Sequence, residues 1–402
     1  MQSFSYITLP SFVCLFWTII LAARWKRNYR SQNVFILNAI AMTTCFYIWN
    51  LYVGGLSDFS LYYKIDAIEP IFTLSINPLT YIYFKSLTNE RPLRWQDFLW
   101  LLPGILVSIG SLIPVCIMGE ENAASFMKEL IGTHNHLKIH TEPVYQVYAF
   151  VSVRLYNWVL MPQIIFTIIY AIRALIRYKK RLKDFYSNLD SKSIENSYAV
   201  LIGYITSSLI FLIVYFLEIQ YLDKNAAIIQ ILAIAWGSTL NYIGYQVATL
   251  KYTADKFHSD LAFADQEAIE QGYEFPGENN STESKENNAH ESRVSQYIER
   301  FNELIDKQQI YLQKDLRLDD VARLMHTNRT YISRMLNEKY NCSFSDYINQ
   351  CRITYAQQLM NSDPNAKQET VALQSGFSHV TSFSRTFKKL VGMTPKEWLN
   401  SL

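Results

Sequence analysis

The side chains best placed for chemistry lie near the C-terminus, in the stretch 380–390. Phe383, Phe387 and Leu390 recur there at intervals of four and three residues, while hydroxyl, guanidinium and ammonium groups stand between them. This spacing predicts an amphipathic helix whose outer face presents hydrogen-bond donors. Hydroxyl and guanidinium groups suit base edges, and ammonium groups suit phosphates. The chemistry indicated is groove recognition of double-stranded DNA.

Another short helix is predicted just before this one, and a tight turn separates the two. Val371, Ala372 and Phe377 lie on one side of this segment. Gly376 stands where the helix must stop, and glycine adopts the left-handed backbone of such a turn without strain. The two amphipathic helices therefore face each other across Gly376 as a helix-turn-helix.

A further helix-turn-helix is predicted upstream, between 316 and 338. Val321 and Ile332 mark the inner faces of its two helices. Asn328 is a suitable N-cap for the second of them, because its side chain can accept a hydrogen bond from a free backbone N–H. A helix predicted from 345 to 360, about 24 Å long, joins the two units.

These residues closely resemble the AraC-type family of transcription regulators, and the resemblance covers 293–402. The family signature is matched at Ala372, Gly376, Phe377, Ser382, Phe383, Ser384, Arg385, Phe387, Lys388, Lys389, Gly392, Thr394 and Pro395. The resemblance implies an all-α double helix-turn-helix domain whose reading helices enter successive major grooves about 34 Å apart. One departure is His326, where the family often has the turn glycine, and histidine adopts the left-handed conformation at some cost.

The resemblance also implies which side chains meet DNA. Base edges would be contacted by Thr330, Ser333 and Arg334 in the first unit and by Thr381, Ser382 and Arg385 in the second. Phosphates would be contacted by Arg329, His379, Lys388 and Lys389, and turns would be set by Gly376, Gly392 and Pro395. An ordinary solvated face is the alternative for the lysines.

The first 250 residues have a different character. Half of the chain's residues are hydrophobic, and they are concentrated before residue 250. Apolar stretches long enough to cross a hydrocarbon core of ~30 Å are 5–23, 34–53, 66–84, 98–118, 148–172, 198–219 and 226–249. The third is the weakest, because it holds two acidic residues and two prolines. A seven-helix transmembrane bundle is the prediction, and a very hydrophobic soluble helical domain is the alternative.

Loop charge supports this topology. Basic residues gather in the first, third and fifth connections, and the second, fourth and sixth hold few. Because basic loops stay cytoplasmic, we expect the N-terminus outside and the C-terminus inside a bacterial cytoplasmic (inner) membrane. The basic residues follow the first apolar run instead of preceding it, so this run is predicted to be a retained anchor and not a cleaved signal.

Polar and charged side chains inside the predicted spans suggest a binding pocket. Ionised groups in a bilayer are costly and normally pair or line a cavity. The hypothesis is a pocket, open to the outside and holding an unknown signal ligand, formed by Asn50, Glu69, Arg154, Asn157, Trp158 and Glu218. The alternative is a structural ion pair of Arg154 with Glu69 or Glu218.

A metal site is considered at one outside loop and disfavoured. His134, His136 and His140 are close enough in sequence to bind a divalent ion. A polar exposed loop reaches the same composition without metal, and the five cysteines lack metal-type spacing. No cofactor is predicted.

The chain therefore divides into a seven-helix sensor (1–250), a polar, partly disordered linker (251–292) and a DNA-binding domain (293–402). Much of the linker has nothing to bury, and about 20 flexible residues reach ~25 Å. A rigid push from the seventh helix is thus not expected, and signalling by dimer geometry, proximity or occlusion is favoured.

The function predicted is a membrane-bound, one-component transcription regulator. Expected partners are double-stranded DNA, the lipid bilayer, the signal ligand, a second copy in a homodimer and, for an activator, RNA polymerase. No phosphate loop or nucleophile elbow is found, so an enzyme is not predicted. The alternative is a membrane receptor or transporter-like protein whose helical C-terminal domain binds a protein partner.

Overall fold

The structure is a computed structural model that describes residues 8–401, except for 26–28, 54–58, 90–92, 134–141, 189–194, 217–225, 251–252, 255, 258 and 260–286. Within the described residues every regular element is a helix, as expected for an all-α protein. The chain separates into two compact units. The first unit contains Met1–Ile176 and Ile194–Asp255, and the second contains Arg177–Ser193 and Lys256–Leu402.

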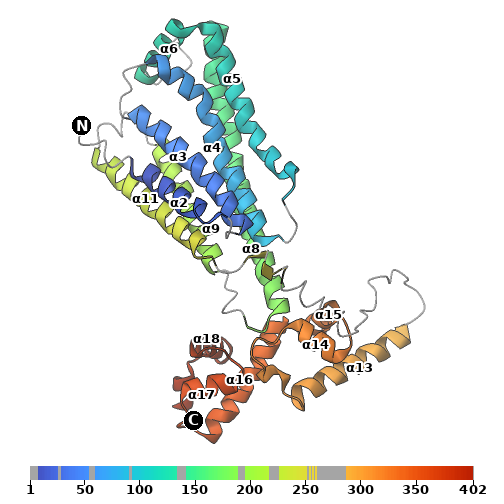
Figure 1. Cartoon of the computed structure of the whole chain (residues 1–402). Coiled ribbons are helices and arrows are strands. Elements are labelled where there is room, and N and C mark those ends of the chain that lie inside the picture. The colour runs from blue at the N-terminus through green and yellow to red at the C-terminus, as the bar shows by residue number, and fades with distance from the viewer. Residues whose placement is uncertain are drawn as a thin grey trace. The chain divides into compact units, whose positions relative to one another are not determined.

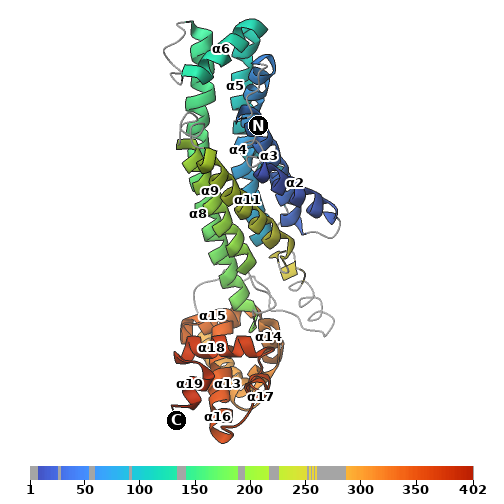
Figure 2. The same cartoon turned by 90° about the vertical axis from the view of Figure 1, so that its left-hand side faces the viewer.

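The first unit is a bundle of long helices, whose arrangement can be followed in Figures 1 and 2. Its elements are α2 (Leu9–Ala22), α3 (Arg30–Val53), α4 (Phe59–Thr88), η2 (Trp95–Leu101), α5 (Leu102–Met118), α6 (Glu120–Thr133), α7 (Pro143–Ala149), the π-helical turn η3 (Phe150–Leu155), α8 (Tyr156–Phe185), α9 (Glu195–Phe216) and α11 (Ala226–Ala248). The last residues of α8 belong to the second unit.

Five described stretches are helical, long and apolar enough to cross a membrane. They are Arg30–Leu51, Trp95–Met118, Pro143–Phe185, Glu195–Val214 and Ala227–Ala248. The first predicted span coincides with α2, a shorter apolar helix, and the third with α4. Five of the seven predicted spans thus meet these criteria, and seven crossings remain a prediction.

The polar residues that lower the hydropathy of α4 face its neighbours. Asn77 and Thr80 are each 5% exposed. The hydroxyl of Tyr204 on α9 donates to Asn77 Oδ1 at 2.6 Å, and Asn38 Nδ2 on α3 donates to Thr80 Oγ1 at 2.7 Å. Because buried polar groups are stable when hydrogen-bonded, α4 tolerates these residues in the bundle interior. Its low hydropathy follows from its position among other helices.

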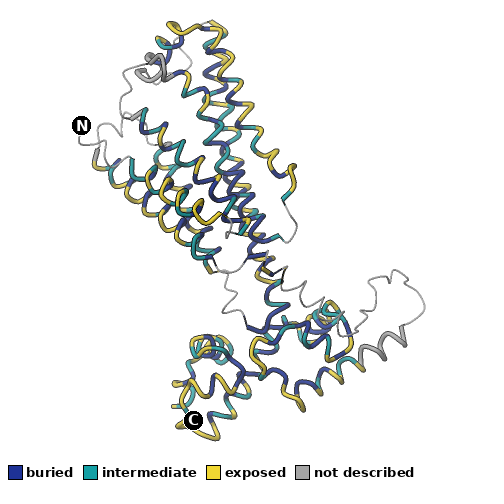
Figure 3. Tube along the Cα trace, in the orientation of Figure 1, coloured by how far each residue is buried: buried dark blue, intermediate teal, exposed yellow. Residues whose placement is uncertain are grey.

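The outward faces of the first unit carry apolar side chains. Leu106 and Ile117 on α5 are 65% and 66% exposed, and Ile165 on α8 is 58% exposed. Figure 3 shows exposed positions along the outer sides of these helices. An apolar exterior around a hydrogen-bonded interior is the arrangement that suits a helix bundle in lipid.

The second unit contains two helix-turn-helix pairs joined by one helix. Its elements are α13 (Asn287–Asp306), η5 (Ile310–Leu312), α14 (Leu318–Met325), α15 (Arg329–Tyr340), α16 (Phe344–Ser362), α17 (Gln368–Gln374), α18 (Val380–Val391) and α19 (Pro395–Leu399). The pairs α14–α15 and α17–α18 are those predicted, and α16 is the predicted joining helix. Since α13 begins at Asn287, it starts within the predicted linker. Linker residues 260–286 lie outside the described residues.

Candidate nucleic-acid interface

The first helix-turn-helix is closed by a left-handed histidine. Val321 and Ile332 are fully buried between α14 and α15. His326 ends α14 with φ 51° and ψ 46°, the left-handed conformation that its place in the turn requires. Asn328 then caps α15, because its side chain accepts a hydrogen bond from the Tyr331 N–H at 2.8 Å. Both local features agree with the sequence-based expectation.

The second helix-turn-helix turns at Gly376, where φ is +82°. A Cβ atom at this position would lie 2.8 Å from the carbonyl oxygen of Tyr311 and 2.9 Å from that of Leu312. Glycine is therefore required both for its backbone conformation and for the close approach of η5. Gly392, with φ +90°, ends α18, and Pro395 opens α19 behind a Thr394–Glu397 capping box.

The side chains predicted to face bases lie on α15 and α18. Thr330 and Arg334 on α15 are exposed, as are Thr381 and Arg385 on α18. Ser333 is half-buried, and Ser382 is only 9% exposed. Each reading helix thus presents one exposed threonine and one exposed arginine, a pair of groups suited to base edges.

The side chains predicted to face phosphates differ in their surroundings. His379 and Lys388 are exposed. Arg329 lies 3.7 Å from Asp319, and Lys389 lies 3.1 Å from Asp346 on α16. The pair of Lys389 with Asp346 is partly exposed and therefore weak, about 0–1 kcal/mol, so a phosphate can replace this carboxylate at little cost. Asp319 is buried, so leaving it unpaired would cost more.

Arg352 is the residue of this unit that sequence reasoning missed. It lies on α16 with its side chain fully buried. Its Nε donates to the carbonyl of Tyr311 at 2.6 Å, its Nη2 donates to that of Gln313 at 2.8 Å, and the guanidinium lies over the Phe377 ring. Burial lowers its pKa to about 10, so it remains charged at neutral pH. Arg352 therefore contacts both the chain before α14 and the turn before α18.

A signal for Arg352 is present in the sequence. Ile348, Arg352 and Ala356 follow one another at intervals of four residues on α16, and all three are fully buried. An arginine on the apolar face of a predicted helix requires buried acceptors. Backbone carbonyls supply them, although their identity depends on the fold.

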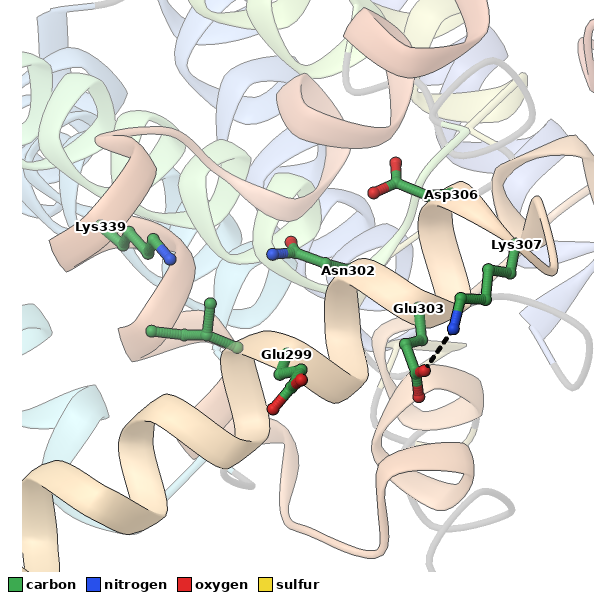
Figure 4. A pocket seen from close by; sticks show the side chains of 7 residues that line it. Glu299, Asn302, Glu303, Asp306, Lys307 and Lys339 are labelled. Carbon is green, nitrogen blue, oxygen red and sulfur yellow. Dashed lines mark hydrogen bonds and ion pairs between the residues drawn. The ribbon is translucent and has the colours of Figure 1, made fainter.

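A surface hollow of about 430 Å³ lies between α13 and α15 (Figure 4). It is lined by Ile298, Glu299, Asn302, Glu303, Asp306, Lys307 and Lys339. Lys307 pairs with Glu303 at 2.7 Å, which leaves the carboxylates of Glu299 and Asp306 on the same surface. Because carboxylates repel phosphates, this hollow is a poor site for DNA.

The described residues of the predicted ligand pocket have the following partners in the first unit. Asn50 Nδ2 donates to Ser11 Oγ at 3.0 Å, and Glu69 accepts from Thr73 and lies 3.8 Å from Cys45 Sγ. Asn157 bonds to its own helix at the carbonyl of Val153. Arg154 and Trp158 are exposed. Glu218 lies outside the described residues.

Glu69 is half-buried, and Asp66, one turn earlier on α4, accepts a hydrogen bond from the hydroxyl of Tyr148. The structure does not bring Arg154 to Glu69, because the described partners of Glu69 are Thr73 and Cys45. His134, His136 and His140 lie outside the described residues, and the part of the chain that is described holds no metal-ligand cluster.

Comparisons with known proteins concern the second unit. Residues 321–401 match the model of a helix-turn-helix domain family. Uncharacterized HTH-type transcriptional regulators of Staphylococcus aureus strains MSSA476 and N315 are 29% identical over 103 residues, which are 25% of this chain and 13% of each relative. The Msm operon regulatory protein of Streptococcus mutans is 26% identical over 107 residues, 27% of this chain and 37% of that protein. No solved structure matches the chain.

Proposed function

Because residues 321–401 are an AraC-type helix-turn-helix domain, we propose that the chain is a transcription regulator that reads duplex DNA with α15 and α18. The observation that carries this proposal is the pair of reading helices, each with an exposed threonine and an exposed arginine. The relatives that it matches share only this part of the chain. The remainder of the function is inferred from the physical character of the first unit.

In this proposal the two reading helices divide their contacts between bases and phosphates. Thr330, Ser333 and Arg334 on α15, and Thr381, Ser382 and Arg385 on α18, contact base edges. Arg329, His379, Lys388 and Lys389 contact phosphates, and Lys389 exchanges Asp346 for a phosphate oxygen. Phosphate contacts release counterions, so affinity falls as salt concentration rises.

The first unit is proposed to span a bacterial cytoplasmic membrane. Its five long apolar helices and the apolar exterior of α5 and α8 support this. With α2 and the interior helix α4 the crossings are seven, and the basic first, third and fifth connections favour an N-terminus outside and a second unit inside. The bundle is then a sensor of a signal ligand at its polar residues, among them Asn50 and Glu69.

The experiment is DNA binding by the full chain in detergent micelles or nanodiscs. A duplex is first selected from random sequence with the wild type, and affinity is measured by fluorescence anisotropy over a range of salt. Arg334→Ala and Arg385→Ala are each expected to weaken binding roughly ten- to hundredfold and to relax sequence preference. Arg300→Ala is the matched control, because Arg300 is an exposed arginine on α13.

Two results would contradict the proposal. A wild-type chain without salt-dependent affinity for any duplex would favour a domain that binds a protein partner. A tag after Leu402 that is labelled from outside intact cells would contradict the proposed topology. These two results are independent, because the first concerns DNA and the second concerns the membrane.

A further inference from the structure

The segment that follows α8 is buried within the second unit. Residues Arg177–Ser193 belong to the second unit, together with Lys256–Leu402, although α8 begins in the first unit. Within this stretch Phe185–Asn188, here called the docking segment, has side chains between 1% and 8% exposed. A loop between two apolar helices usually runs over the surface, so its burial requires specific partners.

Ser187 supplies the central contacts of the docking segment. Its backbone N–H donates to the carbonyl of Leu316 at 3.1 Å, and its own carbonyl accepts from Ser345 Oγ at 3.2 Å. Its hydroxyl accepts from Arg352 Nη2 at 3.4 Å. Ser187 is therefore bonded to the chain just before α14 and to the joining helix α16.

Asn188 connects the two helix-turn-helix pairs. Its Nδ2 donates to Asp315 Oδ1 at 3.4 Å and to Ser378 Oγ at 3.0 Å. Asp315 precedes α14, and Ser378 lies in the turn between α17 and α18. One side chain thus bonds to the segment that precedes the first pair and to the turn of the second pair.

A shared carboxylate links the end of α8 to the second reading helix. Lys183 Nζ lies 3.1 Å from Asp346 Oδ2, and Lys389 Nζ lies 3.1 Å from Asp346 Oδ1. When Lys389 leaves Asp346 to contact a phosphate, Lys183 still neutralises this carboxylate. Without Lys183, Asp346 would hold Lys389 and repel the DNA backbone.

Aromatic packing strengthens the same region. Phe257, which is 4% exposed, lies with its ring centroid 5.4 Å from that of Phe185 and 6.0 Å from that of Tyr186. The stretches of chain before α9 and after α11 therefore meet beside the docking segment. Such edge-to-face contacts add to the burial of apolar surface.

Given the proposed DNA-reading function, we propose that the docking segment holds the two helix-turn-helix pairs in the relative arrangement that DNA requires. While the segment is docked, Thr330, Arg334, Thr381 and Arg385 stay exposed, so docking leaves the predicted reading faces open. The segment follows α8 directly in the chain. A signal received by the first unit therefore reaches the reader through α8, by a shorter covalent route than the predicted linker.

The test is the dependence of DNA affinity on the spacing between half-sites. The full chain is measured on its selected duplex and on a derivative with five base pairs added between the half-sites, about half a helical turn. Wild type is expected to prefer the selected spacing. In the double variant Lys183→Gln, Asn188→Ala, the ratio of affinities for the two duplexes is expected to fall at least fivefold. Its affinity for a single half-site is expected to stay unchanged.

Matched controls separate docking from other effects. Lys180→Gln removes an exposed lysine one turn earlier on α8 and is expected to keep the wild-type preference. A double variant that keeps the full spacing preference would overturn the docking proposal. A wild type that binds no duplex would overturn the DNA-reading function itself, which is a distinguishable failure.

A cross-link tests the same proposal without weakening the fold. After the five native cysteines are replaced, Asn188→Cys and Ser378→Cys are joined by a disulfide under mild oxidation, since their native side chains bond at 3.0 Å. The cross-linked chain is expected to bind its duplex with an unchanged spacing preference. If the cross-linked chain does not bind DNA and the same chain without the cross-link does, the docked state is not the state that reads DNA.

Discussion

In the first helix-turn-helix the turn is made by His326 and faces solvent, whereas in the second it is made by Gly376 and lies against η5. The first pair is also tied internally, because Arg329 at the start of α15 lies 3.7 Å from Asp319 on α14. The second pair is tied to other elements, through Lys389 to Asp346 and through Ser378 to Asn188. The comparison indicates that the ion pair at the first turn lies within its own helix-turn-helix, whereas the second reader is tied at both points to other elements.

Dependence on neighbours is useful for a regulator. If the second reader is positioned by contacts from α16 and from the docking segment, a change at those contacts alters DNA binding without touching a base-reading side chain. The first reader would keep its own structure throughout. Amide hydrogen exchange on the full chain, resolved by peptide, distinguishes the two readers and is the measurement for the stability predictions below.

The largest effect is expected from Arg352→Ala. This change leaves the buried carbonyls of Tyr311 and Gln313 without their donor and opens a cavity beneath Phe377. We expect the second unit to lose about 3 to 5 kcal/mol of stability, with faster exchange in both helix-turn-helix pairs. Gln350→Ala, at an exposed position of the same helix, is the control. Faster exchange in only one pair would contradict the bridging role of Arg352.

The next effect is expected from Gly376→Ala, which should act on one reader alone. The added Cβ would meet two carbonyl oxygens at under 3 Å in a left-handed backbone. We expect a loss of about 2 to 4 kcal/mol, with faster exchange confined to α17 and α18. Gly392→Ala is the matched control, because its φ is also positive but nothing lies within 4 Å of the added Cβ. Equal losses of stability in the two variants would show that backbone strain, and not the close approach of η5, causes the loss in Gly376→Ala.

These contrasts also show what the sequence could and could not predict. The helix-turn-helix pairs, the left-handed turn at Gly376 and the N-cap at Asn328 were predicted, because each depends on residues within a few positions. The hydrogen-bond partners of Arg352 and Asn188 were not, because they lie more than 35 residues away in the chain. The sequence carries no local pattern for such contacts.

The apolar helices of the first unit were predicted in part for a related reason. Apolar length identifies helices that are long enough to cross a membrane, such as α5, but α4 is more polar because its partners are other helices. Hydropathy alone therefore identifies a helix on the apolar exterior of the bundle. It is ambiguous for a helix in the interior of the bundle. Polar residues such as Asn50 and Glu69 bond to different neighbours, and a pocket shared between them stays a prediction.

A smaller effect is expected from Asn328→Ala, which removes the cap of α15. Its side chain accepts from the Tyr331 N–H at 2.8 Å, and loss of such a cap costs about 1 kcal/mol. Faster exchange should appear in the first turn of α15 and leave α18 unchanged. Asn337→Ala, on the exposed side of α15, is the control. A change at α18 would show that the cap of α15 also stabilises the second reader.

The smallest effect, and the only stabilising one, is expected from His326→Gly. His326 is held at φ 51°, a conformation that costs a residue with a Cβ about 1 kcal/mol and costs glycine nothing. Because glycine also gains freedom in the unfolded chain, the net gain should be about 0.5 kcal/mol, seen as slower exchange across α14 and α15. Asn341→Gly is the control at the left-handed C-cap of α15, where φ is 49°, and it should gain less because asparagine tolerates this conformation better than most residues. A loss of stability in His326→Gly would mean that a contact of the imidazole stabilises the fold by more than the backbone strain at His326 destabilises it. The first turn would then depend on the histidine side chain, whereas the second turn depends on Gly376 having no side chain.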